Sequence, residues 1–152
     1  DNLIDLCADY ICRQKNEEYI GDGKLGYGKG IDILALKVRS ILTAFAQLPY
    51  GLILISHSDR KEIETRTGKI TKSMPVLPKK SRDAVLGFVD IVLFATVSNA
   101  KDDEGSSTII HTKPNRYFDA GDRTGRLPRV LPLNYKAFKE AYEKGAKNDT
   151  GK

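Results

Sequence analysis

The sequence predicts an α/β fold with a mainly parallel sheet flanked by helices. Two short apolar runs, residues 52–55 and residues 90–97, are typical of strands that are buried on both faces. Segments with helical periodicity alternate with such runs along the chain, as a parallel sheet requires. The length of 152 residues and the hydrophobic content of 40% suit one soluble domain with a real core.

The first third of the chain is predicted to be largely helical. Residues 2–15 carry apolar side chains at helical spacing, and Asp1 or Asn2 is able to cap the first turn. The stretch 21–30 is half glycine and is therefore expected to be a loop. A second amphipathic helix follows it and ends before the Pro-Tyr-Gly sequence at 49–51.

The rest of the chain is predicted to mix strands and helices. In chain order we expect strand 52–55, a β-hairpin over 63–72, a helix over 79–88, strand 90–97, a polar turn over 102–107, strand 108–112, an irregular segment over 114–132 and a last helix from Tyr135 to a stop at Gly145. Residues 1–145 would then form the folded core, and residues 146–152 a disordered tail.

Composition and charge narrow the class of protein. A net charge of +5 favours an anionic partner. Cys7 and Cys12 are too few for a disulfide scaffold, so a reducing cytoplasm is the simpler expectation. No apolar run is long enough to cross a bilayer, so no membrane partner is expected. Because the chain starts inside a helical pattern without methionine, we expect it to be the later part of a longer protein.

Three common kinds of site are excluded by their spacing. Residues 23–30 approach the phosphate-binding pattern G-x-x-x-x-G-K-[ST], but Gly30 has no hydroxyl for magnesium and the preceding segment is a helix. The cysteines and histidines lie at no recognisable spacing for zinc, so no metal site is predicted. Ser56 and Ser58 lack the flanking glycines of a nucleophile elbow, which excludes that type of hydrolase.

Ser56 and His57 directly follow the first apolar run. In open α/β sheets, ligands bind outside the carboxyl ends of the strands, so both side chains are candidates for facing a ligand. His57 is expected to contact a bound phosphate through an imidazole donor. The alternative is a histidine that bonds a neighbouring backbone group or faces solvent.

Between residues 59 and 83, eight basic side chains stand against four acidic ones. The basic ones are Arg60, Lys61, Arg66, Lys69, Lys72, Lys79, Lys80 and Arg82. One interpretation is a solvated surface segment. The other is a nucleic-acid-binding arm that neutralises phosphates without sequence preference, because aromatic platforms for bases are absent from it.

Several motifs taken together resemble a known family. They are GYGKG, LILISHS, ETRTGKIT, LPKK, GDRTGRLP and LPLNY. They are similar to phage-type nucleotide-binding proteins of the AAA/RecA superfamily, which have a RecA-like P-loop NTPase core and act in single-strand annealing and recombination. The resemblance covers residues 1 to about 138. It implies the second half of such a core, without the N-terminal P-loop portion.

The resemblance also implies roles for individual residues. The glycine-rich segment would be a first DNA-binding loop with Lys24, Tyr27 and Lys29, and residues 59–78 a second one. Ser56 and His57 would sense the γ-phosphate of ATP as catalytic residues. Lys113 resembles a basic residue that reaches the ATP of a neighbouring subunit, and Arg116 would share that role. Arg123 and Arg126 would lie near the same subunit interface, or form a purely structural turn.

The expected function is that of an ATP-dependent single-stranded DNA-binding and recombination ATPase core. The intact protein would bind ATP and Mg²⁺, form a homo-oligomeric ring or filament, bind single-stranded DNA and reside in the cytoplasm. This chain alone would be inactive and would hold no cofactor. A non-enzymatic nucleic-acid-binding module and a RecA-fold helicase relative are the alternatives.

Overall fold

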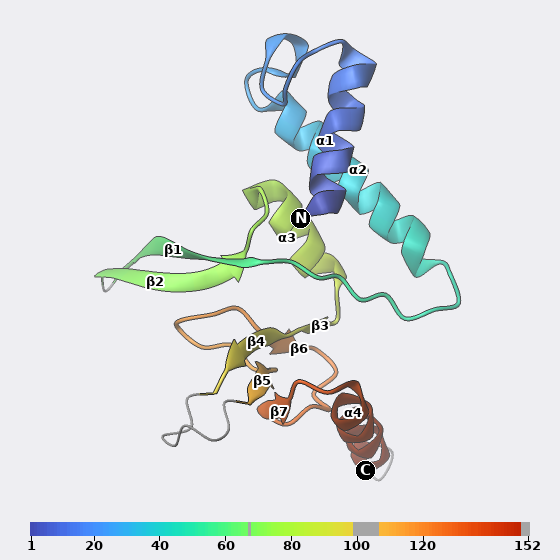
Figure 1. Cartoon of the computed structure of the whole chain (residues 1–152), viewed down its shortest axis with the longest axis vertical. Helices are drawn as coiled ribbons and strands as arrows, with labels where there is room; N and C mark the ends of the chain where they lie inside the picture. The colour runs from blue at the N-terminus through green and yellow to red at the C-terminus, as the bar shows by residue number, and fades with distance from the viewer. Residues whose placement is uncertain (67, 99–106, 150–152) are drawn as a thin grey trace. The chain divides into compact units, whose positions relative to one another are not determined.

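The computed structural model describes residues 1–66, 68–98 and 107–149 (Figure 1). Its elements are α1 (Asn2–Lys15), η1 (Gly23–Leu25), α2 (Lys29–Ala46), β1 (Ser58–Thr65), β2 (Gly68–Pro75), α3 (Lys79–Phe88), β3 (Ile91–Val92), β4 (Phe94–Val97), β5 (Thr108–His111), β6 (Gly121–Asp122), β7 (Val130–Pro132) and α4 (Tyr135–Asp149). The chain divides into two compact units. Unit 1 comprises Asp1–Asp59 and Pro75–Val89, and unit 2 comprises Arg60–Met74 and Asp90–Lys152.

Unit 1 is built from α1, α2 and α3, and the sequence predicted a helix at each of these positions (Figure 1). Its core contains the apolar face of α1 together with that of α2, where Val38 and Leu42 are almost completely buried. Leu25 of η1 is also fully buried, so the short 3₁₀ turn closes this end of the core. Cys7 and Cys12 are both buried and unpaired, consistent with a core role.

The apolar run at residues 52–55 is not a strand, contrary to the prediction. It has no regular secondary structure, and Ile53 and Ile55 are 75% and 87% exposed. A strand exists only through hydrogen bonds to a neighbouring strand. Within the part of the chain that the structure describes, no strand pairs with this run. Its apolar sequence therefore remains on the surface.

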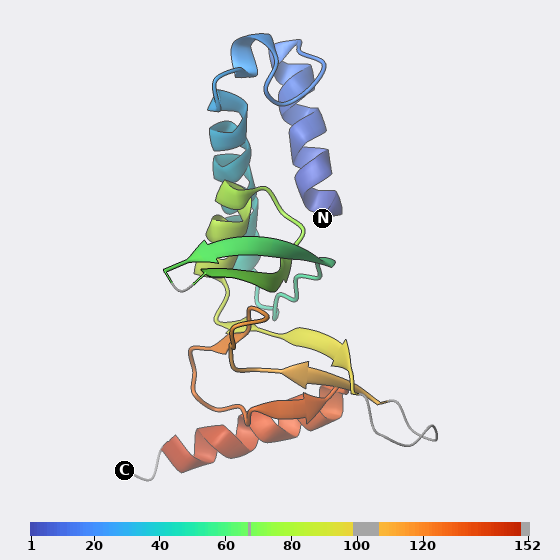
Figure 2. The same ribbon diagram turned by 90° about the vertical axis from the view of Figure 1, so that its left-hand side faces the viewer.

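Unit 2 contains small sheets and one long helix. Strands β4, β5 and β7 form an antiparallel sheet in which Ile110 faces Ala95 on one side and Leu131 on the other. Figure 2 shows α4 lying against this sheet. The contact is apolar, since Phe138 and Tyr142 of α4 pack on the buried cluster of Ile110, Leu127 and Leu131.

The mainly parallel sheet that the sequence predicts does not form among the described residues. The ladders β3–β6, β4–β5 and β5–β7 are all antiparallel. One reason lies in the connections: β4 and β5 are separated by only ten residues, whereas a parallel pair needs a crossover of about a dozen or more. The coarser α/β class holds, because helices and sheets are both present.

Other elements agree with the sequence in kind but not always in extent. β1 and β2 form the predicted hairpin, which is longer than expected and turns around Gly68. Strand 90–97 is interrupted into β3 and β4, and the supposedly irregular segment 114–132 contains β6 and β7. The predicted polar turn at 102–107 falls almost wholly outside the described residues.

The last helix does not stop at Gly145, but continues to Asp149. A β-carbon at Gly145 would lie 2.4 Å from the backbone oxygen of Arg126. This glycine is therefore required for a close approach between α4 and the segment before β7, and not for ending the helix.

Candidate functional site

In unit 1, Ser56 and His57 both form hydrogen bonds with the carboxylate of Asp1. The Ser56 hydroxyl donates to Asp1 Oδ1 at 2.6 Å, while His57 Nδ1 lies 2.5 Å from Asp1 Oδ2. The backbone N–H of His57 also donates to Oδ2, at 3.2 Å. The outer part of the imidazole is open, since the His57 side chain is 91% exposed.

Asp1 is a further candidate residue, which the sequence analysis did not identify. It occupies the N-cap position of α1, but its side chain makes no capping hydrogen bond. Its backbone oxygen accepts from Ile4 and Asp5 instead, which leaves the carboxylate available for residues 56 and 57. A contact across 55 positions leaves no signal in a local pattern.

The glycine-rich segment is not a phosphate cradle. Asp22 accepts a hydrogen bond from the N–H of Gly23, and Glu17 accepts one from the N–H of Lys24, at 2.9 and 2.8 Å. Carboxylates thus hold the backbone donors that a phosphate would need. Lys24 turns its ammonium to the carbonyl of Lys15.

Tyr27 is the most unusual residue of this segment. It has a positive φ of 53° and its side chain is completely exposed. A bulky residue with positive φ is uncommon, and such outliers concentrate at functional positions. Lys29 follows as the first residue of α2. The two therefore remain candidates for contacting a nucleic acid.

The hairpin of β1 and β2 carries five of the predicted nucleic-acid contacts in unit 2. They are Arg60, Lys61, Arg66, Lys69 and Lys72. Two of these lysines form ion pairs, Lys69 with Glu62 at 2.7 Å and Lys72 with Asp119 at 2.5 Å. β1 is exposed at seven of its eight positions, with only Ile63 half-buried. A strand this open suits contact with a partner better than a place in a core.

The remaining basic candidates, Lys79, Lys80 and Arg82, lie on α3 of unit 1. Lys80 pairs with Asp32 of α2 and so joins the two helices. It therefore has a structural role in unit 1, whatever else it contacts.

Within unit 2, the hairpin is bonded to the segment that follows β5. The N–H of Ser73 donates to the carbonyl of Tyr117 at 2.7 Å, and the N–H of Asp119 donates to the carbonyl of Ser73 at 3.3 Å. The Lys72–Asp119 ion pair reinforces this junction, and both of its side chains are mostly buried. Phe118 also stacks on Phe94 of β4. The hairpin is therefore coupled to the same segment that carries Lys113 and Arg116.

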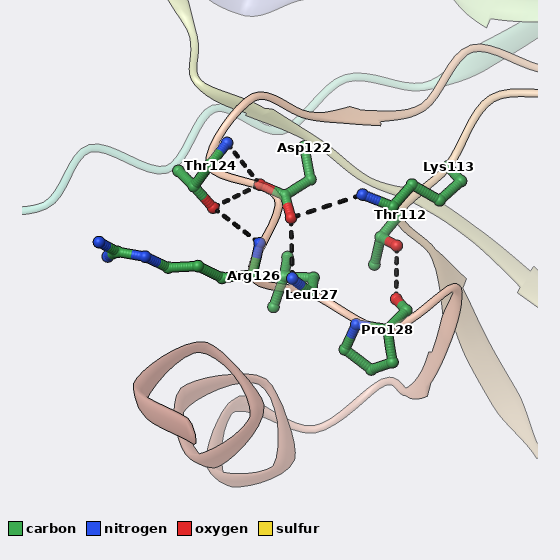
Figure 3. Close-up of polar contacts among 7 residues, drawn as sticks. All are labelled: Thr112, Lys113, Asp122, Thr124, Arg126, Leu127 and Pro128. Carbon is green, nitrogen blue, oxygen red and sulfur yellow. Dashed lines mark hydrogen bonds and ion pairs between the residues drawn. The ribbon is translucent and has the colours of Figure 1, made fainter. Parts of the chain in front are cut away.

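Asp122 organises a tight turn in unit 2 (Figure 3). One carboxylate oxygen accepts from the N–H and the hydroxyl of Thr124, at 2.9 and 2.5 Å. The other accepts from the N–H of Leu127 at 2.8 Å and lies 3.8 Å from Lys113 Nζ. The Asp122 side chain is completely buried, whereas that of Lys113 is 36% exposed. This turn thus holds the ammonium of Lys113 at the surface.

The two arginines of the GDRTGRLP motif lie on the Asp122 turn. The guanidinium of Arg126 lies over the ring of Tyr142 in α4, 5.0 Å from its centroid. Arg123 donates its backbone N–H to the carbonyl of Asp90. Nearby, the Thr112 hydroxyl donates to the carbonyl of Pro128 at 2.5 Å (Figure 3). Arg116 lies over the ring of Tyr117.

The environment of Asp122 predicts a pH dependence of stability. Burial raises its pKa, but the hydrogen bonds from Thr124 and Leu127 and the charge of Lys113 outweigh it, so the pKa lies below the ordinary value of 3.8. A carboxyl with a lowered pKa stabilises the fold above its unfolded-state pKa, and this contribution is lost as the pH falls through the folded-state pKa.

We therefore expect the urea midpoint of the wild type to fall between about pH 5 and pH 2 more steeply than that of Asp122→Asn. The comparison of the two proteins isolates this carboxyl from the other acidic groups. Parallel curves for the two would show that Asp122 does not contribute to acid unfolding.

The predicted site residues do not all fall in the same unit. Ser56 and His57 belong to unit 1, whereas Lys113, Arg116, Arg123 and Arg126 belong to unit 2. Among the described residues, no three His, Cys, Asp or Glu side chains are grouped so that they could hold a metal ion. None of the described helices has the length and hydropathy of a membrane span.

Comparison with known proteins establishes the family. The sequence matches the AAA domain family over residues 1–124, which is most of the chain. The chain belongs to the AAA domain family. No curated protein and no solved structure matches it. The match places this AAA domain in an ATPase-type, P-loop-like class, in agreement with the coarser part of the resemblance seen in its motifs.

Proposed function

We propose that this AAA domain is part of the core of an ATPase that binds single-stranded DNA and acts in strand annealing or recombination, as phage-type RecA-like proteins do. In the intact protein, ATP and Mg²⁺ are bound at the boundary between subunits of a homo-oligomer. Phosphoryl transfer depends on positioning and positive charge more than on covalent chemistry. The net charge of +5 is suited to this requirement.

The observation that carries the proposal is the junction between the basic hairpin and the segment after β5. Ser73 and Lys72 of the hairpin are bonded to Tyr117 and Asp119. A strand of DNA on the hairpin would therefore act on the segment that holds Lys113 and Arg116. Such a mechanical connection is what a DNA-dependent ATPase requires.

In unit 1, His57 has an open imidazole edge that suits a phosphate oxygen. In unit 2, Lys113 has a partly exposed ammonium that suits a phosphate oxygen of the ATP bound by a neighbouring subunit. In the glycine-rich segment, the backbone N–H groups of Gly23 and Lys24 already donate to Asp22 and Glu17. We therefore expect this chain to bind ATP only weakly by itself.

The apolar run at residues 52–55 fits the same proposal. Exposed, contiguous aliphatic side chains mark surfaces that another element covers. In the assembled core, this run would be a strand of the mainly parallel sheet, paired with strands of the same protein. Ser56 and His57 would then stand at its carboxyl end, where ligands of such sheets bind.

The DNA-binding part of the proposal is tested at the hairpin. In the full-length protein, we expect Arg60→Ala/Lys61→Ala to weaken binding to a labelled single-stranded oligonucleotide about tenfold, because two phosphate contacts are lost. The slope of log affinity against log salt should fall by about 0.7 for each contact. Fluorescence anisotropy over a salt series measures both quantities.

The matched control is Lys136→Ala/Lys144→Ala on α4, which removes the same charge from another surface of unit 2. Equal losses in the two double variants would show a general charge effect and would argue against a hairpin site. Absence of binding by the wild type at low salt would refute the DNA-binding function. If single-stranded DNA did not stimulate ATP hydrolysis, the proposed coupling between DNA binding and hydrolysis would be refuted.

A further inference from the structure

The three hydrogen bonds on Asp1 have a chemical consequence for His57. A carboxylate accepts hydrogen bonds and donates none, so the proton of the contact between His57 Nδ1 and Asp1 Oδ2 resides on Nδ1. In the neutral ring, Nε2 is then the unprotonated nitrogen. This is the opposite of the tautomer that prevails in free histidine, where Nε2 carries the proton.

The backbone around His57 is held as firmly as its ring. Its N–H donates to Asp1 Oδ2, and its carbonyl accepts from the N–H of Val76 at 3.0 Å. The Ser56 hydroxyl bridges Asp1 Oδ1 and the carbonyl of His57, at 2.6 and 3.0 Å. Only the Nε2 side of the imidazole remains available, and it faces outward with the exposed face of the ring.

We propose that Asp1 is a positioning residue, which fixes His57 as the Nδ1–H form and presents Nε2 to a phosphate oxygen. This rests on the proposed function, in which His57 senses the terminal phosphate of a nucleotide. An anionic oxygen accepts hydrogen bonds, so a proton on Nε2 must accompany binding, while Nδ1–H still donates to Asp1 Oδ2.

The test is the tautomeric state of His57, read from long-range ¹H–¹⁵N NMR spectra of the full chain. Only two histidines are present, and His57→Gln assigns their signals. Under conditions in which the ring is neutral, we expect the Nδ1–H form to predominate in the wild type. Asp1→Ala should restore the Nε2–H form as the major species.

Asp5→Ala is the matched control, because it removes another carboxylate from the start of α1. It should leave the tautomer of His57 unchanged. If Nε2–H predominated in the wild type, the proposal would be overturned. This outcome does not depend on whether the Asp1→Ala protein folds. An unaltered tautomer in folded Asp1→Ala would overturn the proposal as well.

Two added ligands separate the positioning role from the sensing role. Inorganic phosphate should shift the His57 ring signals in the wild type and should do so much less in Asp1→Ala. A short single-stranded oligonucleotide should leave them in place. The expected tautomer without a phosphate response would refute the sensing role, while the positioning by Asp1 would stand. A response to the oligonucleotide alone would assign His57 to DNA contact and refute its terminal-phosphate role.

Discussion

Replacing Asp122 by alanine is expected to destabilise unit 2 by about 3 kcal/mol. Each buried donor left without an acceptor costs about 1–3 kcal/mol, and the carboxylate accepts from both Thr124 and Leu127. Lys113 would also lose its partner. The measurement is urea unfolding followed by circular dichroism. Hydrogen exchange at the Leu127 amide reports the local effect.

Asp90→Ala is the control for Asp122→Ala, since Asp90 is an exposed aspartate of the same unit. It should change stability by less than about 0.5 kcal/mol, as most surface substitutions do. If Asp122→Ala were equally mild, the turn would not depend on this carboxylate. In that case the position of the Lys113 ammonium would not depend on its ion pair with Asp122.

Replacing Gly145 by alanine is also expected to destabilise unit 2, although alanine is the better helix former. The added β-carbon would lie 2.4 Å from the backbone oxygen of Arg126 and 2.8 Å from its Cα. Overpacking of this kind costs about 1–3 kcal/mol, more than the helix propensity gain of about 1 kcal/mol. Thermal unfolding and the near-ultraviolet signal of the tyrosines would report the displaced α4.

Gly87→Ala provides the matched comparison. Gly87 also lies in a helix, α3, and a β-carbon there would meet nothing within 4 Å. We expect Gly87→Ala to stabilise the protein by about 0.5 kcal/mol, because alanine has the higher helix propensity and meets no steric clash there. Stabilisation by both alanines would mean that α4 does not approach Arg126 closely.

The helices were predictable because their signals are local. Residues 2–15 carry the periodicity of one buried face, and the structure places α1 there. The helix predicted over residues 79–88 is α3. The hairpin was predictable for the same reason, from alternation around Gly68. Each of these elements satisfies its hydrogen bonds within itself or with its immediate neighbour in the chain.

The run at residues 52–55 shows where local reasoning failed. Its composition is that of a buried strand, but burial depends on partners that the sequence of the run does not specify. Among the described residues it has none, and its aliphatic side chains are exposed. Similarly, Gly145 resembles a helix stop, although its role is a close contact with a backbone 19 positions earlier.

For the candidate site, residue type and spacing alone show which chemical groups are available. The basic side chains at residues 60–72, the Ser56–His57 pair and the GDRTGRLP motif could all be identified from residue type and spacing. Together with the AAA domain match, they indicate an ATPase-type protein. The local sequence also determined the helices and the hairpin that carry many of these groups.

How those groups are held depends on the folding of the whole chain. Asp1 meets His57 across 56 positions, and Asp122 meets Lys113 across the turn that it organises. Ser73 joins the hairpin to Tyr117, more than forty residues later. Hydrogen bonds and ion pairs depend on distance in space, and the folded chain brings together residues whose separation in sequence leaves no pattern to recognise.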